Sequence, residues 1–481
     1  MPFAFTLPTT SSVLLSDYFD SATHPSLPLT ATTKRSVLKD ALKKHKRLAP
    51  RDRAAHLPAV HNALNNYIPY LLAINTASGF RDVGPERIDL TIIKPLEVEW
   101  RTTLSTPSPG REAPRQKLTG IHYEVAFTLS TLGYVQMLLA RSQLRSIFDS
   151  TRALSAEQRT AAITGAMKHL LEANSIHNYL LSLLNLSGSK DTPADIQPST
   201  VSALASLALA EATLIVVLKD DPYAAAVTDD RNASNTDWMF KAPSIPKVRA
   251  HLYARISLAA ADYASEAQGL LSKSGASTGR LDNDLIKYAT DLRRTSRGKA
   301  ARFLAIDADL SGKTGDALAW LKGARRELGI PIDTEEGKPK GFRGLKQSWH
   351  ERREDKKVET SGEWGMDAGK LDEIRVVEML EAKWDRENST VNVQLVPPYE
   401  PLLASMPSGR EYHTTQPYTP PSLDASALAL MRAPPEPDER AFRGEEDDSG
   451  KEDQFQGRSA PGAFPGSGAE YGRSATSNSY Y

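Results

Sequence analysis

The strongest constraint on the fold of this chain is a long apolar stripe with helical spacing between residues 248 and 270. Its members recur every three or four residues, the period at which one face of an α-helix returns. Segments 120–150, 156–184 and 198–217 show the same period, and the last ends apolar on every side, which is typical of a buried helix. The chain is therefore predicted to be mostly α-helical. The longest stripe consists of Val248, Leu252, Ile256, Ala259, Tyr263, Ala267 and Leu270.

Two further helices are predicted at residues 281–310 and 315–328, joined by the turn Ser-Gly-Lys-Thr-Gly. The spacing of their small and apolar residues matches one helix–turn–helix unit of the tetratricopeptide kind. Apolar and polar residues alternate over residues 88–100, around Lys94-Pro95, as in a β-strand. We therefore expect stacked antiparallel helices that carry a small β-hairpin or sheet near residues 88–101.

Composition divides the chain near residue 410. Beyond this point Pro, Gly, Ser and acidic residues dominate, and such a segment buries too little apolar surface to offset its ordering entropy. We expect one helical domain over residues 1–410, followed by a disordered tail over residues 411–481. Within the domain, residues 333–372 are charged and punctuated by glycine, and they are predicted to form a mobile loop.

The overall composition excludes several classes of function. Basic and acidic residues number 59 each, so no net charge favours nucleic acid or draws the whole protein to anionic lipid. The chain has no cysteine, which excludes disulfides and thiolate metal sites and fits a reducing compartment. We expect a soluble intracellular protein without a signal peptide. A local basic run is interpreted as a solvated helix face: Lys43, Lys44, Lys46 and Arg47.

The sequence offers no convincing arrangement of catalytic residues. Residues 312–314, Gly-Lys-Thr, resemble the end of a phosphate-binding loop, but the first glycine of that loop would fall on Asp307. A tight turn between helices is therefore the better interpretation. His169 and His177 lie eight residues apart on one predicted helix, without carboxylates at ligand spacing. We expect no catalytic residue, no metal and no cofactor, and a protein that is not an enzyme.

The order of several short segments resembles a known family. His122-Tyr123-Glu124 opens one helix, Lys168-His169 lies in the next, Asp-Ile-Gln-Pro-Ser-Thr-Val at 195–201 opens a third, and Glu-Asn-Ser-Thr-Val at 387–391 runs towards Val-Pro at 396–397. In this order they resemble the BRO-one-type domain of Alix-like proteins. The opening Met-Pro-Phe-Ala-Phe-Thr-Leu-Pro and the short tail resemble the fungal pH-response regulators of that family.

The resemblance implies a curved, mostly helical body around a tetratricopeptide-like core. It also implies an adaptor that binds the carboxy-terminal amphipathic helix of an ESCRT-III subunit, acting with other components of ambient-pH signalling. Such an adaptor helps to assemble the machinery that proteolytically activates a PacC-type transcription factor at alkaline pH. It would be cytoplasmic and reach the cell cortex, plasma membrane or endosomes through its partners. A general endosomal sorting adaptor and a helical enzyme with an unrecognised active site stay open as alternatives.

The apolar part of the family's partner-binding patch falls on Val216, Leu252 and Ile256. Leu252 and Ile256 are one helical turn apart and can form one wall of a groove, with Val216 on the preceding helix as the other. A large aromatic residue that is common in the family is replaced here by Val216, which makes the expected patch shallower. Periodicity alone favours a core position for Leu252 and Ile256 instead.

The polar part of the patch falls on four further residues. Two charged positions of the family are occupied by Thr160 and Thr164, so affinity or partner choice is expected to differ. Lys219 and Arg255 keep a basic rim, which suits an acidic partner helix.

Overall fold

The computed structural model describes residues 2–84, 86–105, 113–147, 155–187, 192–223, 247–278, 281–330 and 364–434. The chain divides into two units, Met1–Ala433 and Pro434–Tyr481. Apart from Pro434, every described residue belongs to the first unit, and the architecture below is that of this unit alone.

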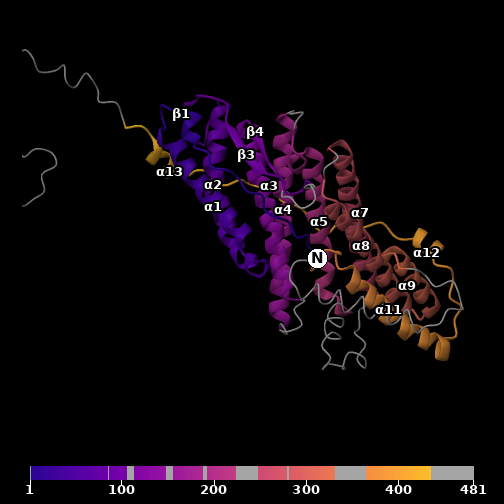
Figure 1. Ribbon diagram of the computed structural model, residues 1–481. Helices are drawn as coiled ribbons and strands as arrows, with labels where there is room; N and C mark the ends of the chain where they lie inside the picture. The colour runs from indigo at the N-terminus through magenta and orange to yellow at the C-terminus, as the bar shows by residue number, and fades with distance from the viewer. Residues whose placement is uncertain are drawn as a thin grey trace, which may run out of the picture. The chain divides into compact units, whose positions relative to one another are not determined.

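Long helices pack side by side in chain order, each against the next (Figure 1). The helices predicted at 120–150, 156–184, 198–217, 248–270, 281–310 and 315–328 are confirmed as α3, α4, α5, α7, α8 and α9. Three other long helices, α1, α2 and α11, were not predicted, although the basic run at 43–47 was interpreted as a helix face and forms the end of α1. The bounds are α1 (Ser26–Arg47), α2 (Pro50–Ser78), α3 (Ile121–Arg145), α4 (Ala156–Ser187), α5 (Pro198–Asp220), α7 (Lys247–Thr278), α8 (Asn283–Asp309), α9 (Thr314–Leu328) and α11 (Lys370–Glu387), with the short elements η1 (Leu15–Asp17), η2 (Ala194–Ile196) and π-helical η4 (Asn388–Asn392).

Helix boundaries follow local chemistry. Pro50 and Pro198 stand at the first positions of α2 and α5, where the missing amide proton costs nothing. The Asp282 carboxylate caps α8 by accepting a hydrogen bond from the Asp284 amide at 2.9 Å. Gly329 ends α9 in the left-handed conformation, with φ of 76°, which glycine adopts without steric cost.

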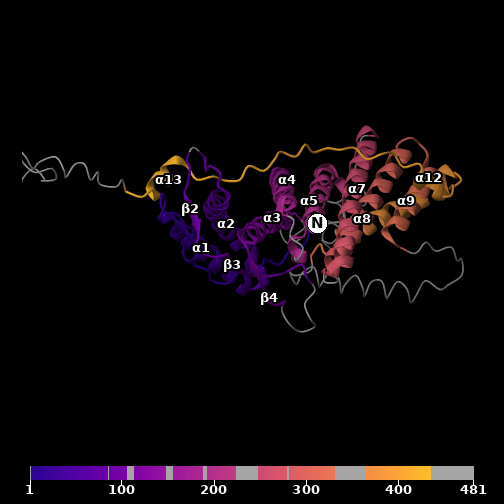
Figure 2. The same cartoon turned by 90° about the horizontal axis from the view of Figure 1, so that it is seen from above.

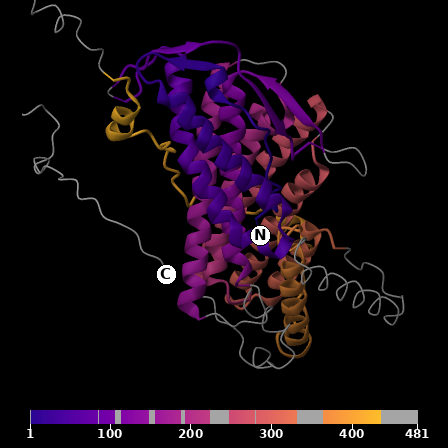
Figure 3. The same ribbon diagram turned by 60° about the vertical axis from the view of Figure 1, so that its left-hand side comes forward.

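The strands predicted over residues 88–101 are present, but they do not pair with each other. Strand β2 (Leu90–Ile92) pairs with β1 (Phe19–Ser21), and β3 (Glu97–Arg101) forms the hairpin with β4 (Arg115–Thr119). Both pairs are antiparallel and lie near the same end of the first helices (Figure 3). The alternation determines which side chains face inward, such as the buried Val98 and Trp100, but it carries no information about the partner strand.

The apolar interior consists of two clusters. The first joins the amino-terminal segment and strands to α1–α5 and parts of α7 and α8. The second is built by α8, α9 and α11 with the end of α5 and the start of α7. Among the described residues, one helix, α5, is long and apolar enough to cross a membrane, but 72% of its apolar window is buried. Because α4 and α7 flank α5, its apolar character on every side reflects a central position in the unit.

A fully buried ion pair anchors the first cluster. The Glu124 carboxylate of α3 accepts hydrogen bonds from Arg35 of α1 at 2.8 Å, the Tyr67 hydroxyl of α2 at 3.0 Å and the Trp100 indole of β3 at 2.7 Å. Arg35 is 1% exposed and Glu124 is completely buried. Burial alone would lower the pKa of Arg35, but the facing Glu124 carboxylate raises it, so the guanidinium stays charged. One carboxylate therefore ties three helices and a strand together.

A second buried ionic cluster joins α8 to α11 and to the end of α5. Arg302 donates to Asp221 Oδ2 at 2.6 Å and to Glu373 Oε1 at 2.5 Å, and Lys299 lies 3.3 Å from Asp221. Burial tends to raise the pKa of Asp221, but Arg302 and Lys299 hold it at about 2. Removing one partner would leave an uncompensated buried charge, so these ion pairs stabilise the packing of α11 against α8.

The unit extends beyond the predicted domain end at residue 410. Short α12 (Glu400–Ala404) is followed by an extended segment, residues 405–424, here called the C-terminal strap, and then by α13 (Ala425–Met431). Figure 2 shows the strap passing α7, α5 and α4 between these two helices. Leu428 and Met431 of α13 are buried, and the Ala433 amide donates to Thr23 O at 2.8 Å.

Composition does not predict that the strap is ordered, because the strap docks through a few spaced contacts rather than through a run of apolar residues. Pro417, Pro420 and Pro421 keep it extended and do not prevent docking. Of the predicted mobile loop, residues 333–363 lie outside the described residues. Residues 364–372 are described, and Trp364 and Ala368 are buried in the first cluster. Of the predicted tail, residues 435–481 also lie outside the described part of the chain.

Candidate functional site: a groove across α4, α5 and α7

The seven predicted site residues come from three consecutive helices that pack side by side. Residues 160 and 164 lie on α4, 216 and 219 on α5, and 252, 255 and 256 on α7. Because α5 stands between α4 and α7, contacts along one face of the three helices can combine into one surface.

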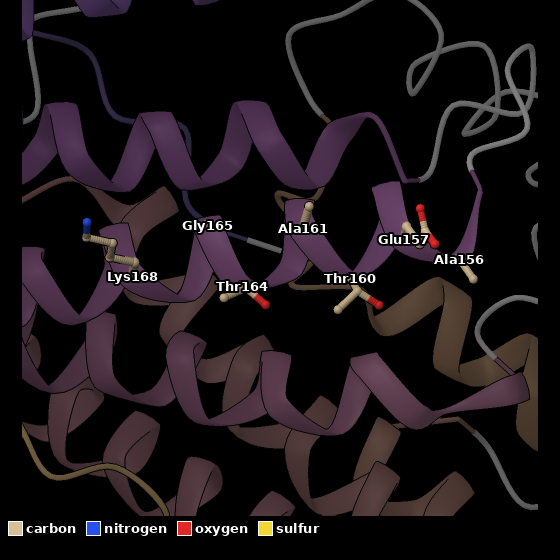
Figure 4. Close-up of a pocket in the computed structure, with 7 residues that line it drawn as sticks. All are labelled: Ala156, Glu157, Thr160, Ala161, Thr164, Gly165 and Lys168. Carbon is tan, nitrogen blue, oxygen red and sulfur yellow. The ribbon is translucent and has the colours of Figure 1, made fainter.

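The α4 residues line a hollow. A cavity of about 620 Å³, here called the α4 pocket, is lined by the first three and a half turns of that helix. Figure 4 shows Thr160 and Thr164 projecting from the same side of α4, as four-residue spacing requires. Both side chains are exposed. The lining residues are Ala156, Glu157, Thr160, Ala161, Thr164, Gly165 and Lys168.

Small residues let the neighbouring helices approach α4 closely. A Cβ on Gly165 would lie 2.3 Å from Gln143 Oε1 of α3, and a Cβ on Gly133 of α3 would lie 2.5 Å from His177 Cε1 of α4. Both distances are far below contact distance, and at Gly133 the neighbour is the fully buried His177 ring, so this position needs glycine. The close α3–α4 packing fixes the helix that lines the pocket.

The apolar positions divide into two accessible side chains and one core side chain. Val216 and Leu252 are half-buried and pack on the edge of the second core cluster. Ile256 is 1% exposed and belongs to the interior of that cluster, so it cannot contact a partner directly. Leu252 lies one turn earlier on α7, at the edge of the second core cluster, whereas Ile256 lies where that cluster covers the helix. For Ile256 the core position favoured by periodicity is the one observed.

The two predicted rim cations also differ. Lys219 is exposed near the end of α5, next to Asp220, whose carboxylate accepts a hydrogen bond from Tyr253 of α7 at 3.0 Å. The Arg255 guanidinium instead donates to Ser408 O of the strap at 3.1 Å, and the Arg255 carbonyl accepts from the Arg410 amide at 2.9 Å. Arg255 therefore holds the strap rather than forming an open basic rim. No local sequence pattern predicts these contacts between Arg255 and the strap.

The strap crosses the same face of all three helices. On α7, a Cβ at Gly409 would lie 2.7 Å from Ala259 N, so the strap backbone touches the helix backbone. On α5, His413 lies 3.2 Å from Ala212 O, one turn before Val216. On α4, the ring centroids of Tyr418 and Tyr179 lie 5.6 Å apart. The candidate site is thus the face of α4, α5 and α7 that the strap borders; the α4 pocket is its hollowed part, and the whole face is here called the groove.

The boundary is clearest on α4. The strap docks over Ser175, Asn178, Tyr179 and Ser182 and encloses a second hollow of about 340 Å³. These residues continue the helix face of Thr164 and Lys168 by three- and four-residue steps. One continuous face of α4 is therefore open at its amino-terminal end and covered by the strap at its carboxy-terminal end.

The groups that were considered for chemistry have structural surroundings. The turn at 312–314 joins α8 to α9, and the Gly315 amide donates to Gln394 Oε1 at 3.0 Å, so that amide is already occupied. His177 is fully buried and its pKa is lowered by burial to about 4, while His169 Nδ1 lies 2.6 Å from Gln136 Oε1. In the described part of the chain, no three histidine, aspartate or glutamate side chains converge as metal ligands would.

Comparison with known proteins agrees with this architecture. The family model for the BRO1-like domain matches residues 85–407. The pH-response regulator protein palC of Emericella nidulans is 44% identical over 506 aligned positions, covering 97% of this chain and 99% of that protein.

Solved structures show the same fold. A complex of the ALIX BRO1 domain with CHMP4C superposes with a TM-score of 0.50 at 16% identity, covering 87% of this chain and 95% of that one. ALIX bound to the SIVmac239 PYKEVTEDL late domain gives 0.51 at 15% identity, covering 88% of this chain and 49% of that one. The matched residues, the helical array and the full-length relative together show that this chain belongs to the BRO1-like domain family.

Proposed function

We propose that this chain is a non-catalytic adaptor in fungal ambient-pH signalling. A relative of nearly the same length, with 44% identity, is a pH-response regulator, and this similarity supports the same role here. The observation that carries the proposal is the exposed α4 pocket, which lies on one face of α4 and beside the half-buried Val216 and Leu252 of the neighbouring helices, an arrangement that suits a protein partner.

The proposed partner is the carboxy-terminal amphipathic helix of an ESCRT-III subunit. The ALIX BRO1 domain has been solved in complex with CHMP4C, which supports a protein ligand for this fold. An amphipathic helix has apolar anchors at every third or fourth position and needs a shallow apolar channel between neighbouring helices. Thr160, Thr164, Val216 and Leu252 supply the small and apolar contacts of such a channel, and Lys219 supplies a cation for an acidic helix.

The roles of Ile256 and Arg255 are indirect in this proposal. Ile256 supports Leu252 from the core, and Arg255 keeps the strap at the border of the groove through its two backbone contacts. Small threonines in place of charged side chains leave the α4 pocket open, so the partner helix can approach α4 closely. Burying one leucine-sized anchor contributes roughly 1.5–3 kcal/mol before the costs of ordering.

The proposed consequence is assembly at a membrane site. Bound to ESCRT-III at the cell cortex, plasma membrane or endosomes, the adaptor would bring together the components that proteolytically activate a PacC-type transcription factor at alkaline pH. A general role in endosomal sorting predicts a different phenotype. A Thr164→Trp strain should fail to process the factor at alkaline pH while it still sorts unrelated cargo, and a defect in both would favour general sorting.

Binding of a fluorescently labelled ESCRT-III carboxy-terminal helix tests the site in vitro. Thr164→Trp fills the α4 pocket at an exposed position, so affinity should fall about tenfold or more while melting stays unchanged, since tenfold corresponds to about 1.4 kcal/mol. Thr33→Trp, at an exposed threonine of α1, is the matched control and should bind normally. Equal affinity of both variants and the unsubstituted protein would contradict the proposed site.

A further inference from the structure

The first helix of the array carries an unusual outer face. Positions 29, 33, 37, 40, 44 and 47 of α1 follow three- and four-residue steps and therefore share one side of the helix. All six side chains are exposed. Among long helices α1 packs against α2, so this outer face is not required for the core.

The carboxy-terminal half of this face is basic. Lys43, Lys44 and Arg47 line a hollow of about 550 Å³ together with Asp40 and Leu48. The Asp40 carboxylate lies 3.3 Å from Lys39 Nζ, so its charge is offset by a cation outside the hollow. The whole chain has zero formal net charge, and a concentration of cations at this point is therefore a local property.

The amino-terminal half of the same face is aliphatic. Leu29 is 61% exposed and Val37 is 55% exposed, although both are large apolar side chains. Leu430 of α13 is 85% exposed as well, and α13 docks near the residues that precede α1, where the Ala433 amide donates to Thr23 O. Exposed aliphatic side chains in line with cations are typical of helices that lie at a bilayer interface.

A purely structural explanation accounts for part of this pattern. Cations in the last turn of a helix interact favourably with the negative end of its dipole, which suits Lys44 and Arg47. Dipole compensation gives no reason for Lys43 to join them around one hollow, and none for Leu29 and Val37 to face solvent on the same side.

We propose that the outer face of α1 docks on an anionic bilayer surface, with Lys43, Lys44 and Arg47 at the lipid phosphates and Leu29 and Val37 at the level of the headgroups. The occupant is an anionic bilayer because phosphate groups complement the cations while the acyl boundary accepts the aliphatic side chains. The face lies on α1, away from the groove over α4, α5 and α7, and the inference goes beyond the proposed partner binding. It would give the adaptor a membrane contact of its own.

Flotation of the full chain with phosphatidylcholine vesicles, with and without phosphatidylserine, tests the proposal. The protein should float with the anionic vesicles alone, and added salt should release it. Each cation near such a surface contributes about 1 kcal/mol, so the combined change Lys43→Glu, Lys44→Glu and Arg47→Glu should weaken partitioning on the order of 100-fold or more.

Two further variants separate charge from position. Leu29→Gln with Val37→Gln keeps every charge and should weaken partitioning by several-fold while leaving its salt dependence intact. The matched control, which is Lys273→Glu, Lys313→Glu and Arg326→Glu, changes the net charge equally at exposed positions away from α1 and should float like the unsubstituted protein.

Equal flotation of the α1 charge variant and the unsubstituted protein would overturn the proposal, as would an equal loss in the control. Inositol hexakisphosphate, a soluble polyphosphate, distinguishes a phosphate site from a surface. Tight binding of this anion without flotation on anionic vesicles would also overturn docking on a bilayer. Binding of the ESCRT-III helix should be the same in all three variants, so failure of this inference is distinguishable from failure of the groove.

Discussion

Replacing Glu124 by glutamine should destabilise the protein strongly, although the two side chains have almost the same shape. Four donors converge on the carboxylate: Arg35 Nε at 2.8 Å, Arg35 NH2 at 3.2 Å, the Tyr67 hydroxyl at 3.0 Å and Trp100 Nε1 at 2.7 Å. A glutamine amide has to place its NH2 group where one of the two oxygens stands. At either place that group faces an Arg35 N–H, which cannot accept a hydrogen bond.

The magnitude follows from the burial of both charges. Arg35 and Glu124 are 1% and 0% exposed, so the substitution leaves a guanidinium in the interior without its counter-charge. Breaking a buried pair in this way typically costs about 3–5 kcal/mol. Since whole domains are stable by roughly 5–15 kcal/mol, the variant should lose about a fifth or more of the total free energy of unfolding.

Urea unfolding followed by circular dichroism and tryptophan fluorescence measures this cost. Trp100 is stacked on Phe127 at 5.3 Å and donates to Glu124, so its emission also reports the local packing. Glu157→Gln is the matched control because Glu157 is exposed on α4. Adding Arg35→Met to Glu124→Gln removes both charges, and the double variant should cost less than the sum of the single ones. A loss below about 1 kcal/mol for Glu124→Gln, or strict additivity, would refute the reasoning.

Three further outcomes are expected. Burial raises the pKa of Glu211 to about 7 from 4.5, so its contribution to the free energy of unfolding is full below pH 4.5 and falls by about 3 kcal/mol as the pH rises towards 7. The stability of Glu211→Gln relative to the unsubstituted protein should therefore increase over that pH range. A constant difference between their urea midpoints from pH 5 to 8 would count against this expectation. Gly409→Ala should lift the strap from the backbone of α7, so trypsin should cleave the strap severalfold faster than in Gly269→Ala, where the added methyl meets open space; equal rates would disprove this contact. Gly133→Ala should cost about 1–3 kcal/mol in thermal or urea unfolding because its Cβ would lie 2.5 Å from the buried His177 ring, and an unchanged midpoint would exclude the close α3–α4 packing.

Periodicity revealed the central helices and missed the outer ones for physical reasons. The helices α3, α4, α5 and α7 are covered on several sides, so their apolar residues recur conspicuously. Helix α1 is basic along much of its length, and α2 contains Pro58 and Pro69 inside the helix, which usually indicate a helix end. Helix α11 follows a charged segment, and it is held against α8 by the buried contact between Arg302 and Glu373. These two residues are 71 positions apart, so no local pattern reveals the contact.

The candidate site was predictable where helix register decides the outcome. Thr160 and Thr164 share one face of α4 because they are four residues apart, whatever that helix packs against. Ile256 and Arg255 depended on neighbours that register does not reveal. Ile256 is covered by the second core cluster, and Arg255 is covered by a strap more than 150 positions away in the chain. Long-range docking of a proline-rich segment leaves no periodic pattern to detect.

Single-cysteine cross-linking tests the central claim, the groove over α4, α5 and α7, most directly. The chain has no cysteine, so Thr164→Cys introduces a unique attachment point in the α4 pocket. A photoreactive label at this position should cross-link the ESCRT-III carboxy-terminal helix, and an excess of unlabelled helix should prevent the reaction. The same label at Thr33→Cys on α1 should give no specific product. Equal cross-linking from both positions, or none from Thr164→Cys while the helix still binds, would contradict the account.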